Sequence, residues 1–128
     1  MDGSAGFWID PKEQRLIRRL PVGEAVVERI LDLVRAARPT AAEAHAAVKD
    51  AVSWGPGPRA AQALMLAIRA RALLQGRLVP GLDDVAALAH PVLIHRMALG
   101  FAARAEGQTL DGLIARLVGD LLGMEAAA

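Results

Sequence analysis

The residues best suited to chemistry in this 128-residue chain surround a short turn of glycines and prolines. Trp54 precedes Gly-Pro-Gly-Pro at 55–58, and Arg59 follows directly. Gly55 and Gly57 permit a positive φ or a close approach of another backbone. Pro58 suits the first position of a helix, because the N–H that it lacks has no partner there.

Arg59 would then lie in the first turn of that helix, where the helix dipole disfavours a cation by roughly 0.3–1 kcal/mol. Two interpretations of this placement are open. Arg59 is either a solvated surface side chain or an arginine presented beside free backbone N–H groups to bind an anion, such as a phosphate.

The residues after Arg59 predict one long helix that closes at Gly76. Apolar residues recur at helical spacing and extend onto a second side, so we expect this helix to be buried among others. The recurring positions are Ala61, Leu64, Met65, Ile68 and Ala72. The polar residues Arg59, Gln62 and Arg69 fall within about a quarter-turn of one another at about 100° per residue.

Further helices must hold this segment in place, and the predicted fold is all-α, a small helical bundle of four main helices with shorter helical pieces. A short charged helix is expected over 11–20, and a clearly amphipathic one over 22–37. Thr40 and Glu43 match a capping box, so residues 40–52 should form a short helix or an irregular linker.

Proline and glycine divide the second half of the chain. A helix over 82–90 should stop before Pro91, and Pro91 should start another helix that residues 101–105 prolong. Thr109 should cap a last, strongly amphipathic helix that ends at Gly123.

These elements predict three parts of the chain. Residues 1–20 form an N-terminal tail with a short helix, which could be a linker, and residues 21–123 form the helical domain. Residues 124–128 form a C-terminal tail. The apolar cluster Phe7-Trp8-Ile9 either docks on the domain or remains from a contact with a missing neighbour.

Four side chains outside the turn receive structural interpretations. Trp54 is expected to anchor the turn by packing, with stacking on a ligand base as the alternative. His45 is expected to be exposed and without a role. Asp83 and Asp84 are interpreted as charges that favour the start of a helix.

Composition excludes several classes of protein. Lys and Arg number 15 and Asp and Glu 14, and a net charge of +1 argues against a nucleic-acid binder that works by bulk charge. Without cysteine there is no disulfide, thiolate metal site or cysteine nucleophile. His90 and His95 do not share a helix face, so no metal site is expected. No apolar run approaches a membrane span and no signal peptide is visible, so we expect a cytoplasmic protein.

The turn and its surroundings resemble a known family. Gly-Pro-Gly-Pro-Arg at 55–59 resembles the sensor-2 segment of MoxR-type AAA+ ATPases, whose pattern is Gly-x-x-Pro-Arg. In the family's order, residues 35–39 resemble the end of its first lid helix and residues 69–77 the close of its central helix. Residues 83–85 and 91–96 resemble its next elements. The resemblance implies the C-terminal helical lid of such an ATPase, without the nucleotide-binding core.

The same resemblance implies roles for the turn. Arg59 would be the sensor-2 arginine that reaches the γ-phosphate of ATP, with Gly55, Gly57, Pro58 and Gln62 beside the nucleotide. The missing core would bind ATP and hold magnesium, and closure of the lid would couple hydrolysis to chaperone-like remodelling. Family members form rings, usually hexamers, in which the lid contacts a core domain and neighbouring subunits. Their partners often carry von Willebrand factor A domains.

This chain alone is not expected to hydrolyse ATP. It lacks a Gly-x-x-x-x-Gly-Lys-Ser/Thr loop, and its lysines, Lys12 and Lys49, follow no glycine-rich turn. The chain is therefore either a fragment of a longer protein or a lid that has lost its core.

Two other classes of function are open. A free-standing helical interaction module would present a groove to a partner peptide without binding nucleotide. A helix-turn-helix DNA reader is the weaker alternative, because the net charge of the chain is close to zero.

His95-Arg96 is either a helix-capping or surface pair, or a pair near the nucleotide or a neighbouring subunit.

Overall fold

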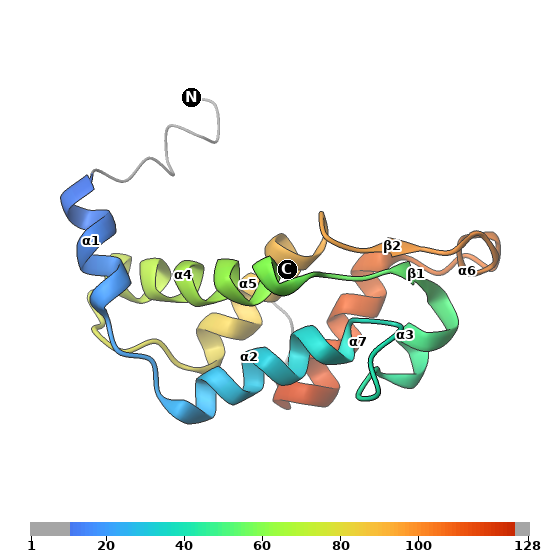
Figure 1. The fold of residues 1–128 in the computed structure, drawn as a ribbon, viewed down its shortest axis with the longest axis horizontal. Helices are drawn as coiled ribbons and strands as arrows, with labels where there is room; N and C mark the ends of the chain where they lie inside the picture. Colours follow the sequence, from blue (N-terminus) through green and yellow to red (C-terminus); the bar gives the residue numbers. More distant parts are fainter. Residues whose placement is uncertain (1–10, 125–128) are drawn as a thin grey trace.

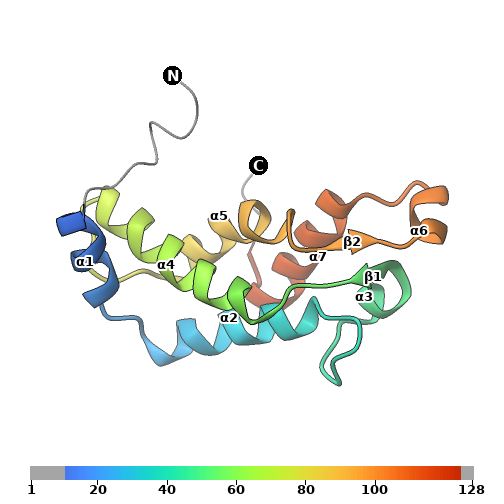
Figure 2. The same ribbon diagram turned by 45° about the horizontal axis from the view of Figure 1, so that its top comes forward.

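The computed structural model describes residues 11–124, which form an elongated helical bundle with a small two-stranded ribbon at one end (Figures 1 and 2). The elements follow in the order α1 (Pro11–Arg19), α2 (Glu24–Ala36), α3 (Ala46–Ala51), β1 (Val52–Trp54), α4 (Pro58–Leu74), α5 (Leu82–Leu93), β2 (Ala98–Leu99), α6 (Phe101–Ala105) and α7 (Leu110–Leu122). The four longest helices are α2, α4, α5 and α7, so the predicted all-α bundle of four main helices is confirmed.

Helix α4 is the centre of the bundle and packs on α5, α2 and α1. Helix α7 packs on both α5 and α2. Helices α2 and α4 run in opposite directions, so the end of α2 lies beside the start of α4 (Figure 1). Nearly all of the largest fully buried apolar side chains come from α2, α4, α5 and α7: Ile30, Leu33, Val34, Leu64, Ile68, Val85, Leu93, Ile114, Leu117 and Val118; Val48 on α3 is the exception.

The predicted apolar stripe of α4 forms its buried face. Leu64, Ile68 and Ala72 are fully buried, whereas Ala61 and Met65 pack against the edge of the core. Burying one leucine or isoleucine side chain contributes about 1.5–3 kcal/mol. This stripe therefore holds α4, and with it Arg59, firmly in the bundle.

The ends of α4 and α7 are closed as predicted. Gly76 has a φ of 76°, its N–H donates to Leu73, and the N–H of Arg77 donates to Ala72 at 2.8 Å, which is a Schellman motif. The Thr109 Oγ1 accepts a hydrogen bond from the Gly112 N–H at 3.1 Å, and Gly123 ends α7 with a φ of 65°.

The prediction of a helix break at Pro91 was wrong. Helix α5 continues through Pro91 to Leu93, because Val92 and Leu93 are buried on the core side and their burial offsets the missing N–H. No second helix begins there. Ala98–Leu99 is instead strand β2, antiparallel to β1, and the residues expected to prolong that helix form a separate short helix, α6.

The capping box at Thr40 and Glu43 was also wrong. Residues 37–45 form no helix, and α3 begins at Ala46 with His45 as its N-cap. The His45 Nδ1 accepts from the Ala47 N–H at 3.0 Å, and its Nε2 lies 2.8 Å from Asp120 Oδ2 on α7. The expectation that His45 is exposed and without a role is therefore wrong as well.

Within residues 11–124, no helix combines the length and the apolar character that crossing a membrane would require. The short helix expected over 11–20 is present as α1. The Phe7-Trp8-Ile9 cluster and most of the expected C-terminal tail lie outside the described residues.

Candidate functional site

The glycine–proline turn is wedged against the C-terminal end of α2. A Cβ atom at Gly55 would lie 2.5 Å from the Ala37 carbonyl oxygen and 3.0 Å from the Arg38 Cα. The Arg38 Nε donates to the Pro56 carbonyl at 2.8 Å. The predicted close approach at Gly55 is confirmed, and this contact sets where α4 begins.

Helix α4 starts as predicted, with Gly57 as N-cap in an extended conformation and Pro58 in the first turn. Pro58 has no N–H, and the Ala60 N–H donates to the Gly57 carbonyl at 3.1 Å. Few backbone donors are left at this helix end. The side chain of Arg59, which is exposed, is therefore the principal group there that could contact an anion.

Arg59 borders two hollows on the surface. The first has a volume of about 670 Å³ and lies along α4, lined by Arg18, Arg59, Ala61, Gln62, Ala63, Met65, Leu66 and Arg69. The predicted polar side of α4 thus faces one hollow. Arg69 is partly committed elsewhere, because its Nε donates to the Leu20 carbonyl at 3.0 Å.

The second hollow, of about 440 Å³, lies at the start of α4 and is lined by Trp54, Gly55, Gly57, Pro58, Arg59, Ala60, His95 and Arg96. Four of the five predicted nucleotide-contacting residues, Gly55, Gly57, Pro58 and Arg59, lie together here. The fifth, Gln62, lines the first hollow instead. Among the residues that the structure describes, neither lining contains an acid.

The expectation that Trp54 anchors the turn by packing was wrong. Its side chain is 54% exposed and forms a wall of the second hollow. Trp54 lies on β1, paired with Ala98 of β2, and the Ser53 hydroxyl donates to the Ala98 carbonyl at 3.2 Å. The ribbon therefore presents the indole at the surface, where a ring could stack on it.

His95 and Arg96 reach the same hollow from the turn after α5. The Arg96 Nη1 donates to the Val92 carbonyl at 2.8 Å, and its backbone N–H donates to Leu93. Arg96 thus caps the C-terminal end of α5, as one sequence interpretation held, and in addition lines the hollow. The alternative interpretation that placed His95 and Arg96 near the nucleotide rested on the resemblance alone, because 37 positions separate Arg96 from Arg59.

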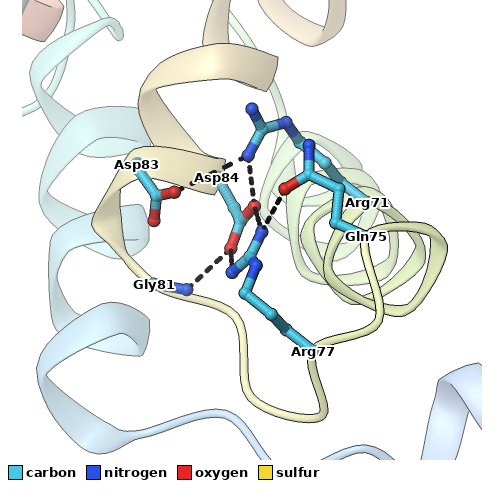
Figure 3. A network of polar contacts seen from close by, with 6 residues as sticks. All are labelled: Arg71, Gln75, Arg77, Gly81, Asp83 and Asp84. Carbon is cyan, nitrogen blue, oxygen red and sulfur yellow. Dashed lines mark hydrogen bonds and ion pairs between the residues drawn. The ribbon is translucent and has the colours of Figure 1, made fainter.

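A different group of arginines is bound to a buried carboxylate at the far end of α4. Asp84 is fully buried and accepts hydrogen bonds from Arg71 Nη1 at 2.5 Å, from both Nη atoms of Arg77 at 2.9 and 2.6 Å, and from the Gly81 N–H at 2.8 Å (Figure 3). Asp83 is mostly exposed and lies 3.8 Å from Arg71. The interpretation of Asp84 as a mere helix-start charge was therefore incomplete, since it joins the end of α4 to the start of α5.

The pKa of Asp84 reflects two opposing effects. Burial raises the pKa of the carboxyl group, but the hydrogen bonds from Arg77, the Gly81 N–H and Arg71 outweigh burial and lower the pKa from 3.8 to about 2. The hydrogen bond between Arg77 and Asp84 also raises the pKa of Arg77 above its usual value. Arg71 and Arg77 are thus satisfied by Asp84, whereas no acid in the part of the chain that the structure describes pairs with Arg59 or Arg96.

The three histidines differ in their acidic partners. His45 contacts Asp120, and the His90 Nε2 lies 2.5 Å from Asp111 Oδ1, so each joins a neighbouring element to α7. His95 has no acidic partner among the described residues. No group of three metal-binding side chains occurs over 11–124.

Comparison with known proteins identifies the family. A family model described as "AAA lid domain" matches residues 44–117, which include the turn, α4, α5 and both arginines of the second hollow. The chain belongs to the AAA lid domain family.

A solved structure resembles this AAA lid domain over most of its length. The crystal structure of a protein from Cytophaga hutchinsonii, described as a "putative ATPase", matches with a TM-score of 0.77 and 26% sequence identity. The match covers 84% of this chain and 32% of the other, so the lid spans about a third of the length of that protein. Among curated proteins, none matches the chain.

The family assignment agrees with the motifs of the sequence. Segments 69–77 and 83–85, which resemble consecutive parts of the lid, contain both arginines and the aspartate of the buried ion-pair network. These motifs therefore have a structural explanation. Segments 55–59 and 91–96 supply most of the second hollow, where Gly55 and Arg96 also make structural contacts.

Proposed function

We propose that this AAA lid domain is the sensor-2 lid of a MoxR-type AAA+ ATPase and closes over ATP that a core domain binds. The observation that carries the proposal is Arg59, an exposed arginine in the first turn of the central helix, beside a hollow in which no described residue is acidic. A guanidinium in such a place suits a phosphate, because it can donate two hydrogen bonds and supply a positive charge.

In this proposal each part of the turn has a task. Gly55 lets the turn approach α2, Pro58 begins the helix, and Arg59 donates to the γ-phosphate or to the charge that develops on it. The core supplies the phosphate-binding loop and magnesium. Gln62, one turn further along α4, borders the neighbouring hollow, from which it can contact the core or a polar part of the nucleotide.

Loss of the γ-phosphate would remove the contact with Arg59, and the lid would then move as a body relative to the core. We propose that this movement drives chaperone-like remodelling within a ring, such as a hexamer, in which neighbouring subunits contact the lid. Proteins with von Willebrand factor A domains are the partners that the MoxR resemblance suggests, and a cytoplasmic location accords with that assignment.

The test is Arg59→Ala in a protein that joins this lid to its AAA+ core. We expect the ATPase rate to fall by at least about tenfold, since removing one preorganised donor to a developing charge costs about 10²–10³ in buried active sites and less in an open one. Arg59→Lys should recover little, because lysine cannot make the two-pronged contact.

Arg116→Ala provides the matched control, because Arg116 is an exposed arginine on α7 and lines neither hollow. It should leave the rate unchanged. Equal ATPase rates and nucleotide affinities in Arg59→Ala and the wild type would refute the sensor-2 role.

A second candidate function is the interaction module without nucleotide binding. One observation favours it: Leu74, Leu78 and Val79 are 82%, 66% and 54% exposed, and they lie at the far end of α4 from Arg59. Replacing Leu74 and Leu78 by serine would abolish partner binding in that case. If the same variant kept its partner and Arg59→Ala lost ATPase activity, the lid function would stand alone.

A further inference from the structure

Arg59 and Arg96 reach one hollow from separate parts of the fold. Arg59 comes from the start of α4, and Arg96 is held by the Val92 carbonyl at the end of α5. Only one of the two Nη atoms of Arg96 is used in that contact, so the guanidinium keeps donors for a ligand.

The charge of this hollow is unbalanced. Its lining, as far as the chain is described, contains two arginines and a histidine but no acid. At the far end of α4, by contrast, the neighbouring arginines Arg71 and Arg77 are neutralised by Asp84. A hollow that gathers cations without a counter-charge favours an anionic ligand.

The remaining wall of the hollow is aromatic. Trp54 is 54% exposed, although tryptophan is among the side chains that gain most from burial. The ribbon pairing of Trp54 with Ala98 keeps the indole on the rim, beside the turn that leads to Arg59. An indole face next to guanidinium groups suits a ligand that has both a planar ring and phosphates.

We propose that Arg96 is a second phosphate-binding arginine, which acts with Arg59 on the polyphosphate of a nucleotide whose base lies against Trp54. The inference rests on the proposed function, because the same nucleotide would contact Arg59. It adds that the lid holds the polyphosphate from two sides, with His95 as a further donor at the same rim.

The test uses Trp54 as a reporter of binding to the 128-residue chain. The chain has two tryptophans, so Trp8→Phe leaves the fluorescence of Trp54 alone. The probes are inorganic triphosphate, ATP without magnesium, and adenosine. We expect saturable changes with triphosphate and ATP, and a tighter dissociation constant for ATP than for triphosphate, because only ATP brings a ring to the indole.

Arg96→Ala and Arg59→Ala, each in the Trp8→Phe background, should each weaken binding of both phosphate probes by about fivefold to tenfold, as expected for loss of one charge-assisted contact. Arg96→Gln should weaken it similarly while keeping a donor for the Val92 carbonyl, which separates loss of charge from loss of the α5 cap. Arg116→Ala is the control and should bind as the parent chain does.

The outcomes separate this inference from the function on which it rests. If Arg59→Ala weakened binding and both Arg96 variants did not, the role of Arg96 would be refuted and that of Arg59 kept. Equal affinity for triphosphate and ATP would refute the contact with Trp54, and the absence of any saturable change would refute the site. If both arginine variants weakened binding here but Arg59→Ala left the ATPase rate of the core-containing protein unchanged, the sensor-2 function would fail and the binding site would remain.

Discussion

Replacing Asp84 by asparagine should destabilise the lid strongly. Asparagine keeps the size of the side chain but removes the charge that two arginines share, and its amide donor has to face other donors. Removing one partner of a buried ion pair costs about 3–5 kcal/mol. Because Arg71 and Arg77 are 31% and 36% exposed, water can partly solvate them, and we expect a loss near the lower end, about 3 kcal/mol.

Urea unfolding followed by circular dichroism measures this loss directly. A loss of about 3 kcal/mol should also lower the melting temperature of a chain of this size by about 10 °C. Asp83→Asn is the matched control: Asp83 is the neighbouring acid, 59% exposed and 3.8 Å from Arg71, and its replacement should cost less than about 0.5 kcal/mol.

The pH dependence provides an independent check. The pKa of Asp84 is about 2 in the folded chain and close to 3.8 in the unfolded chain, so its contribution is present above about pH 4 and is lost as the pH falls towards 2. The difference corresponds to about 2 kcal/mol, which Asp84→Asn should no longer lose on acidification. If Asp84→Asn unfolded within about 1 kcal/mol of the wild type and showed the same acid dependence, our account of this network would be refuted.

Two further predictions concern the elements that place the site. Gly55→Ala should destabilise the chain by about 1–3 kcal/mol in thermal unfolding, because its Cβ would lie 2.5 Å from the Ala37 carbonyl oxygen. The control is Gly57→Ala, whose Cβ would meet no atom within 4 Å and which should change the stability by less than about 1 kcal/mol. Equal melting temperatures of the two variants would contradict the close contact between Gly55 and α2. His45→Ala should cost about 1 kcal/mol in urea unfolding through loss of the α3 cap and the contact with Asp120, and His45→Asn should recover part of this, since asparagine can cap the helix. If His45→Asn were as unstable as His45→Ala, the cap would contribute nothing.

The sequence predicted those parts of the fold that local rules govern. The stripe of α4, the glycine after it and the Thr109 cap follow from helical spacing and from residue types with strong preferences at helix ends. Pro91 misled the same reasoning, because a local preference against helix was overcome by the burial of Val92 and Leu93, which depends on the partners of α5.

Only part of the candidate site could be predicted from the sequence. Arg59 and its turn form a contiguous motif, so the resemblance found them together. Trp54 adjoins this motif in the sequence, but its exposure and the approach of Arg96 depend on tertiary structure: β1 pairs with β2, and nothing in two segments of two and three residues indicates that pairing. Asp84 had a detectable signal, since a carboxylate three residues after a glycine can bond back to the glycine N–H, but its burial between Arg71 and Arg77 is a tertiary property.

The wedge at Gly55 has a consequence for how such motifs change in evolution. The first residue of the Gly-x-x-Pro-Arg pattern is required by its contact with α2, so selection for a stable fold alone would maintain it. Arg59 contributes no comparable packing, and Arg96 contributes one hydrogen bond to the Val92 carbonyl, so under the proposed function a bound ligand is the main reason to preserve both. Among lids that have lost their ATPase partner, the glycine should therefore be retained while the two arginines are replaced. A match to the Gly-x-x-Pro-Arg pattern would then indicate common ancestry, whereas retention of both arginines would indicate that the lid still binds its ligand.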